Sequence, residues 1–118
     1  MFGNVDDLQY SRLELAFENK LIRTTCENEE SAKEQYGVEV SAKLKARLAD
    51  LRAVMFVSEL VAGNPQEIRC NPHPIYKLDL CDGYKITFCA NHVKVPSAAN
   101  GEIMWSKVNR IRILNIDN

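Results

Sequence analysis

The sequence lacks any hydrophobic run long enough to cross a membrane. Its longest clear apolar run is Ala53–Val57, whereas a spanning helix needs about 20 consecutive apolar residues. The first residues, Met1–Asp7, contain neither the basic region nor the apolar stretch of a secretory signal. We therefore expect a cytoplasmic protein that is not inserted in a membrane.

The sequence also lacks the Cys-x-x-Cys spacing that is typical of zinc and redox sites. Its four cysteines are Cys26, Cys70, Cys81 and Cys89. Without an export signal, reduced and mostly buried thiols are the expected state. Zinc could bind the side chains of Cys70, His73, Cys81 and Cys89, but the spacing of these residues matches no known zinc motif. We therefore expect no metal and no other cofactor.

A strong excess of charge of either sign is missing too. The net charge is −1, which is not typical of a nucleic-acid-binding protein. The charge is unevenly distributed, because residues 1–34 sum to −4 and residues 35–118 to +3. This mildly basic part permits phosphate contacts without requiring them. On charge alone, solvated surfaces are the simpler explanation.

The length and composition predict one globular domain. The chain has 118 residues, of which 46% are hydrophobic and 26% are charged, as in ordinary globular proteins. It shows no internal repeat and no low-complexity segment. Residues 1–10 are polar and acidic without a period, so we interpret them as a flexible extension and residues 11–118 as the domain.

The first half of the domain has one strand pattern followed by helix patterns. Apolar residues alternate over Arg12–Phe17, which predicts a strand. Two helical pieces, 18–26 and 29–36, meet at Asn28, and Gly37 is expected to cap the second. The clearest helix is 40–55, followed by one short extra turn over 56–62. The apolar stripe of the helix over 40–55 consists of Val40, Leu44, Leu48, Leu51 and Met55.

A β-hairpin over Ile75–Phe88 is the strongest signal in the second half, because Asp82–Gly83 is a turn sequence between alternating runs. A two-residue loop would mix apolar and polar side chains on each face. We therefore expect a three-residue loop, Cys81–Gly83, with Gly83 at positive φ. The apolar face would then pair Leu80 with Tyr84, Leu78 with Ile86 and Tyr76 with Phe88, and the charged face Asp79 with Lys85 and Lys77 with Thr87.

The remaining segments complete an α+β pattern. Residues 67–70 predict a short strand, and 91–105 a long loop in which His92 is exposed and Trp105 contacts the core. Over 107–117 the alternation breaks at Leu114, which indicates either a bulge or a strand covered on both faces. We expect a small, mostly antiparallel sheet with the N-terminal helices on one face.

Several segments occur in an order that is known from one protein family: Tyr36-Gly37, Ala42-Lys43-Leu44, Leu51-Arg52-Ala53, Arg69-Cys70, Leu78-Asp79-Leu80, Gly83–Phe88, Trp105-Ser106-Lys107 and Ile111–Leu114. Taken together, they resemble the RelE/HigB-like toxins, the plasmid-maintenance killer proteins of type II toxin–antitoxin systems. The resemblance implies a RelE/ParE-like fold and a ribosome-dependent mRNA endoribonuclease (mRNA interferase) that inhibits translation. It also implies a cognate helix-turn-helix antitoxin as partner, beside mRNA and the ribosome.

The resemblance also implies a set of site residues. The family's Arg-Cys-His segment corresponds to Arg69, Cys70 and His73, and its Tyr-Arg pair on the hairpin to Tyr84 and Lys85. Lysine keeps the positive charge of that arginine but loses bidentate phosphate contact. The candidate catalytic residues are therefore His73, Lys85 and Arg69. Lys77 on the hairpin, and Arg110 and Arg112 on the last strand, are candidates for RNA binding.

A second hypothesis belongs to another class of protein. Many members of the family end in Asp-Tyr-His, whereas this sequence ends at Asp117–Asn118. This difference and the near-neutral charge favour a RelE-fold protein that does not cleave RNA. Such a protein would act by binding an antitoxin or another protein, as ParE-like relatives do. Both hypotheses share the same expected fold.

Overall fold

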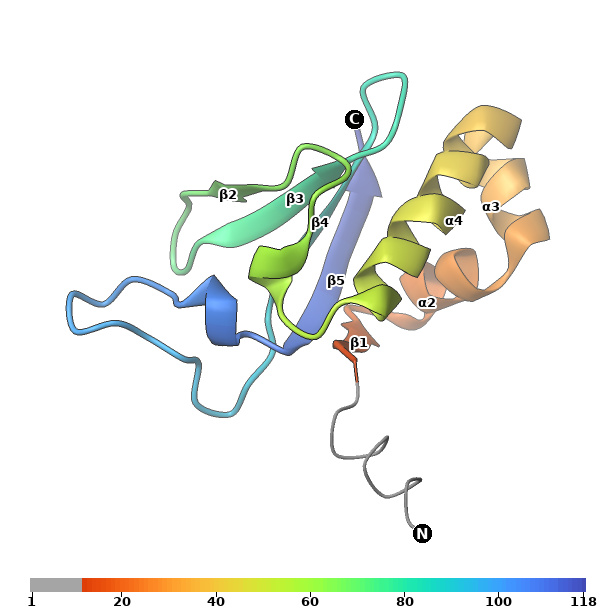
Figure 1. Ribbon diagram of the computed structural model, residues 1–118. Coiled ribbons are helices and arrows are strands. Elements are labelled where there is room, and N and C mark those ends of the chain that lie inside the picture. The colour runs from red at the N-terminus through yellow and green to blue at the C-terminus, as the bar shows by residue number, and fades with distance from the viewer. Residues whose placement is uncertain (1–11) are drawn as a thin grey trace, which may run out of the picture.

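The computed structural model describes residues 12–118, which fold into an α+β domain of three α-helices and five strands (Figure 1). The α+β class expected from the sequence is confirmed, and the expected N-terminal extension, residues 1–10, lies outside the described residues. In chain order the elements are β1 (Glu14–Phe17), α2 (Lys20–Glu27), α3 (Glu29–Tyr36), α4 (Val38–Ala53), the 3-10 helix η1 (Val57–Glu59), β2 (Gln66–Ile68), β3 (Ile75–Asp79), β4 (Lys85–Ala90), the 3-10 helix η2 (Trp105–Lys107) and β5 (Arg110–Asp117).

The five strands form one mixed sheet in the order β1-β5-β4-β3-β2. The first strand runs parallel to the last, with Glu14 beside Arg110 and Phe17 beside Ile113. All other neighbouring strands are antiparallel. The sheet therefore joins the two ends of the described chain, and β5 lies between β1 and β4.

The hairpin of β3 and β4 has the register that the apolar pattern predicts. Leu78 pairs with Ile86 and Tyr76 with Phe88, and the Leu80 amide donates to the Tyr84 carbonyl at 2.8 Å. Gly83 lies at φ 81°, a backbone conformation that favours glycine. The three-residue loop is therefore confirmed, and Tyr84 packs edge-on against Tyr36, with ring centroids 5.3 Å apart.

The break in alternation along β5 is a bulge. Thr87 faces Asn115, but its neighbour Phe88 faces Ile113, so that Leu114 has no partner on β4. The extra residue changes the parity of the strand, because a strand's side chains alternate between the two faces. Ile113 and Ile116 thus both point into the core, where they are 0% and 5% exposed.

Capping residues set the boundaries of the first two helices. The Asn19 side chain accepts a hydrogen bond from the Ile22 amide, and the Asn28 side chain one from the Ser31 amide. Asn28 also ends α2, since its own amide donates to the Thr24 carbonyl. The predicted interruption at Asn28 is confirmed. Helix α4 begins two residues before the predicted start and ends two residues before the predicted end.

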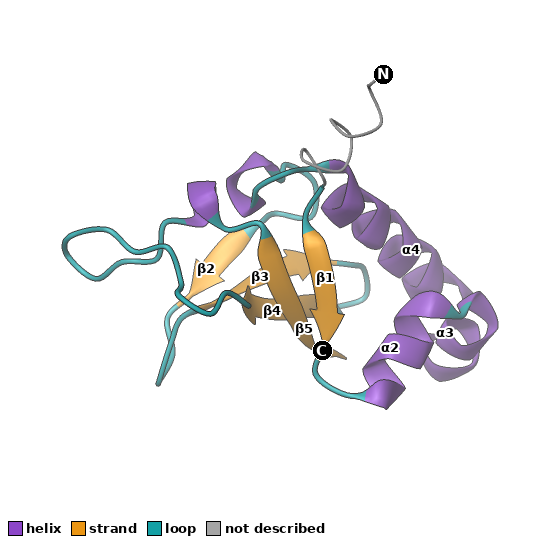
Figure 2. Cartoon of the chain, turned by 90° about the horizontal axis from the view of Figure 1, so that it is seen from below, coloured by secondary structure: helices purple, strands orange, loops and turns teal. Residues whose placement is uncertain are grey.

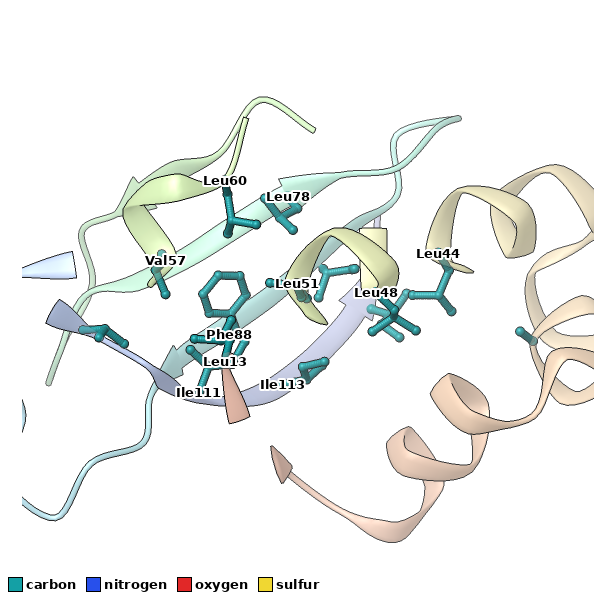
Figure 3. Packing of buried hydrophobic residues seen from close by; sticks show 14 residues of the cluster. Leu13, Leu44, Leu48, Leu51, Val57, Leu60, Leu78, Phe88, Ile111 and Ile113 are labelled. Carbon is teal, nitrogen blue, oxygen red and sulfur yellow. The ribbon is translucent and has the colours of Figure 1, made fainter. Parts of the chain in front are cut away.

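The core lies between α4 and one face of the sheet. Leu44, Leu48 and Leu51 of α4 point towards Leu78, Phe88 and Ile113 (Figure 3). The extra turn η1 covers the rest of this face, as predicted, with Val57 and Leu60 buried. No helix within residues 12–118 lies across the opposite face of the sheet (Figure 2). None of the described helices is long and apolar enough to span a membrane.

Candidate functional site

The sheet face opposite α4, which we call the open face, carries most of the sequence-predicted cations. Its side chains alternate with the buried ones along β3, β4 and β5, so they point away from the core. Strand β1 adds Glu14 and Ala16, which lie beside Arg110 and Arg112. The open face consists of Glu14, Ala16, Glu18, Lys77, Asp79, Lys85, Thr87, Cys89, Arg110, Arg112, Asn115 and Asp117.

Lys85, Asn115 and Asp117 form a polar group at the hairpin end of the open face. Lys85 Nζ lies 3.7 Å from Asp117 Oδ1, and the Asn115 side-chain amide donates to Asp117 Oδ2 at 2.7 Å. The Lys85 side chain is 35% exposed and that of Asp117 49%, so solvent and a ligand can reach both. This arrangement directs a carboxylate and an ammonium group towards the same space.

Lys77 has a different environment from the one expected of a phosphate ligand. Its side chain is only 11% exposed, and its ammonium group donates to Asp79 Oδ1 at 2.8 Å. This hydrogen bond is the main cause that lowers the pKa of Asp79, with smaller contributions from Asn64 and from the charges of Lys77 and Lys85. Lys77 therefore keeps Asp79 ionised and is poorly placed to contact RNA.

Arg110 and Arg112 are accessible and paired with acids from the neighbouring edge of the sheet. Arg112 Nε lies 2.9 Å from Glu18 Oε1, and Arg110 Nε lies 3.6 Å from Glu14 Oε1. The two arginine side chains are 42% and 53% exposed. The parallel pairing of β1 with β5 brings these acids to the arginines. Cys89 lies beside Arg112, and burial raises the pKa of its thiol.

Arg69 belongs to a separate cluster on the core side of the sheet. Glu67 pairs with Tyr76, whose ring packs on Trp105 with centroids 4.7 Å apart. The Glu67 carboxylate accepts a 2.8 Å hydrogen bond from Trp105 Nε1 and lies 3.5 Å from Arg69 Nε. Arg69 also donates to Glu102 at 2.6 Å. Arg69 thus ties β2 to the long loop that precedes β5.

His73 is exposed and lies far from Lys85. It precedes β3, whereas Lys85 faces Asp79 at the other end of that strand. The strand alone separates them by roughly 13 Å at about 3.3 Å per residue. Cys70 Sγ lies 3.1 Å from the His73 carbonyl oxygen. The three candidate catalytic residues, His73, Lys85 and Arg69, are therefore not brought together.

His92 is partly buried rather than exposed as expected. Its Nε2 accepts a hydrogen bond from the Asn109 amide at 3.2 Å, which joins the start of the long loop to its end. Burial and the nearby Arg110 lower the pKa of His92, and Glu14 opposes them. The expected exposure of His92 was wrong because its contact with Asn109 depends on the path of the long loop back to β5. No short sequence pattern around His92 reveals that path.

Metal binding finds no support in the part of the chain that the structure describes. No group of three or more His, Cys, Asp or Glu side chains among residues 12–118 could hold an ion. Cys70 and Cys81 lie at opposite ends of β3, and all four cysteines are free thiols.

A cleft of about 340 Å³ lies between the three helices. Cys26 lines this cleft, and burial raises the pKa of its thiol to about 11.

The open face brings ammonium and guanidinium groups next to carboxylates, and the candidate residues from the sequence did not include all of its members. Asp117 and Asn115 were not among the candidates, although a bulge at Leu114 places both on the same face as Lys85. The break in alternation at Leu114 was the signal that could have identified them, because a bulge there moves positions 115 and 117 to the face of Arg110 and Arg112.

No family model, curated protein or solved structure matches this chain.

Proposed function

We propose that this chain is a RelE/HigB-like toxin that cleaves mRNA on the ribosome, with Lys85 and Asp117 at its reacting centre. The observation that carries the proposal is the 3.7 Å approach of an accessible carboxylate to an accessible ammonium group on an uncovered sheet face. The hairpin register that presents Lys85 there supports the proposal as well. A cognate helix-turn-helix antitoxin would be the natural neutralising partner.

The chemistry needs no metal at this centre. In cleavage of RNA, a base removes the proton from a 2′-hydroxyl, and that oxygen attacks the adjacent phosphorus. The 5′ oxygen leaves and takes a proton from water, so that a 2′,3′-cyclic phosphate and a 5′-hydroxyl result. In the proposed mechanism Asp117 acts as the base. Lys85 stabilises the charge that develops on the phosphate oxygens.

The surrounding residues would orient these two groups. Asn115 holds one oxygen of Asp117 by a 2.7 Å hydrogen bond, which leaves the other oxygen towards Lys85. Arg110 and Arg112 continue the open face along β5 and would bind flanking phosphates. His73 and Arg69, which the resemblance suggests for catalysis, lie away from this centre, and we assign them no chemical step.

Cleavage in a translating bacterial extract tests the proposal. The message is mapped by primer extension after addition of the wild-type chain, Lys85→Ala or Asp117→Asn. Lys94→Ala and Asp82→Asn are matched controls, because both residues are exposed in loops. We expect ribosome-dependent new 5′ ends with the wild type and both controls, and a loss of at least about 100-fold in each site variant, the usual contribution of a positioned acid–base group.

An intact message at high concentration of folded wild-type chain would overturn the nuclease proposal. The charge balance of the open face favours the second candidate function in that case. Each of its four cations lies within 4 Å of an acid, and such a mixed surface suits a protein partner better than a polyanion. Binding of an antitoxin or another protein, without cleavage, would then be the function to test.

A further inference from the structure

The cations of the open face already have anionic partners within the chain itself. The pairs are Lys77 with Asp79, Lys85 with Asp117, Arg110 with Glu14 and Arg112 with Glu18, at 2.8, 3.7, 3.6 and 2.9 Å. A carboxylate and a phosphate compete for the positive charge of the same guanidinium group. RNA that reaches this face therefore meets cations whose charge is already neutralised.

The two arginine pairs differ from the two lysine pairs. Asp117 belongs to the reacting centre, and Asp79 is held by the buried Lys77. Glu14 and Glu18 have neither role, and both come from the β1 edge with side chains 63% and 47% exposed. Exposed ion pairs contribute little stability, because water screens both charges. RNA can thus displace these two glutamates from the arginines. The displaced carboxylates still lie within about 8 Å of the bound phosphates, the distance over which salt screens charges, and therefore repel them.

We propose that Glu14 and Glu18 set the RNA affinity of the open face by competing with phosphates for Arg110 and Arg112. This inference rests on the proposed function, because it concerns the same RNA-binding surface. The two glutamates keep binding to free RNA weak, so that stable engagement requires the additional contacts that a ribosome provides. Weak binding to free RNA would confine cleavage to translated messages.

The proposal predicts an unusual dependence on salt. A phosphate that binds an unpaired arginine releases the counterion of that phosphate, which gives a slope of about −0.7 per contact in single strands. In the wild type, the displaced glutamates become exposed anions and attract salt cations again, so the net release is smaller. Neutral residues at positions 14 and 18 should therefore make RNA binding both tighter and more sensitive to salt.

Fluorescence anisotropy with a labelled 2′-O-methyl 12-mer of uridine measures this binding without cleavage. The variants are Glu14→Gln, Glu18→Gln and both together, at several salt concentrations. The matched control is Glu30→Gln with Glu39→Gln, which removes the same charge on exposed helix surfaces; Glu30 also pairs with a cation, Lys33, at 3.6 Å. We expect the open-face double variant to bind about tenfold tighter with a steeper slope, and the control less than twofold tighter.

The other outcomes separate this inference from the proposed function. Equal gains in the open-face and control variants would overturn the inference, since net charge alone would then explain the change. If wild type binds RNA and Arg112→Ala weakens that binding, while the glutamine variants match wild type, only the role of Glu14 and Glu18 falls. Absence of RNA binding in every folded variant would overturn the inference, whereas the proposed function stands or falls by cleavage in the translating extract. Circular dichroism melting verifies folding of each variant.

Discussion

His92 shows how one partly buried side chain can make the stability of this chain depend on pH. It must be neutral for Nε2 to accept the Asn109 amide hydrogen bond. Its folded-state pKa is lowered, chiefly by burial and then by Arg110. A lowered pKa means that the unfolded chain binds the proton first, so stability is full above the ordinary value of 6.5 and declines below it.

We therefore expect the wild type to lose stability between pH 7.5 and 5.5, and His92→Gln to lose less. Glutamine offers an uncharged acceptor oxygen at every pH, which can replace Nε2. Urea unfolding at the two pH values measures the difference. His73→Gln is the matched control, because His73 is exposed and is the only other histidine. A pH dependence that survives His92→Gln unchanged would rule out this role of His92.

Single residues were predictable where their environment depends on near neighbours in the sequence. The alternation around Asp82–Gly83 was enough to place Lys77 opposite Thr87 and Asp79 opposite Lys85. It could not show that Lys77 would be buried or that Lys85 would pair with Asp117, because both depend on other strands. The ion pair of Arg112 with Glu18 was not predictable either, because the pairing of β1 with β5 brings these two residues together.

At the scale of elements, Arg69 joins strand β2 to the long loop through Glu67 and Glu102. We expect Arg69→Ala to raise amide hydrogen exchange several-fold in the loop, particularly at Ala98 and Gly101, with little effect on β3 and β4. Mass spectrometry of exchanged fragments measures this change. Lys94→Ala is the control, because Lys94 is exposed in the same loop.

The same variant separates a structural role of Arg69 from a catalytic one. If Arg69 only anchors the loop, mRNA cleavage should stay within a few-fold of wild type. A loss of cleavage comparable to that of Lys85→Ala, with unchanged exchange in the loop, would instead place Arg69 in the reaction.

Element boundaries were predictable where a local residue sets them. Asn28 interrupts the helical pattern because its side chain caps α3 while its amide ends α2, and both signals are visible in the sequence. The end of α4 was placed two residues late, because Met55 continues the apolar spacing although the helix ends at Ala53. The spacing of apolar residues alone does not show at which residue a helix ends.

For the molecule as a whole, stability depends on one core between α4 and the sheet. Leu51, Phe88 and Ile113 are 0% exposed in it. We expect Leu51→Ala to lower the free energy of unfolding by about 2–5 kcal/mol, since it leaves a cavity in this core. Leu21→Ala, at a position 68% exposed, should cost far less. Urea unfolding monitored by circular dichroism measures both, and equal losses would contradict a single central core.

The parallel pairing of β1 with β5 constrains how the protein is made. Strand β1 is synthesised before the other described strands, but it finds its partner only when β5, the last of them, has been synthesised. Contacts so distant in sequence form late in folding. Because β5 supplies Arg110, Arg112 and Asp117 and holds β1 with Glu14, the open face is assembled only after β5 has been synthesised. A nascent chain therefore carries no finished copy of this surface until β5 has left the ribosome.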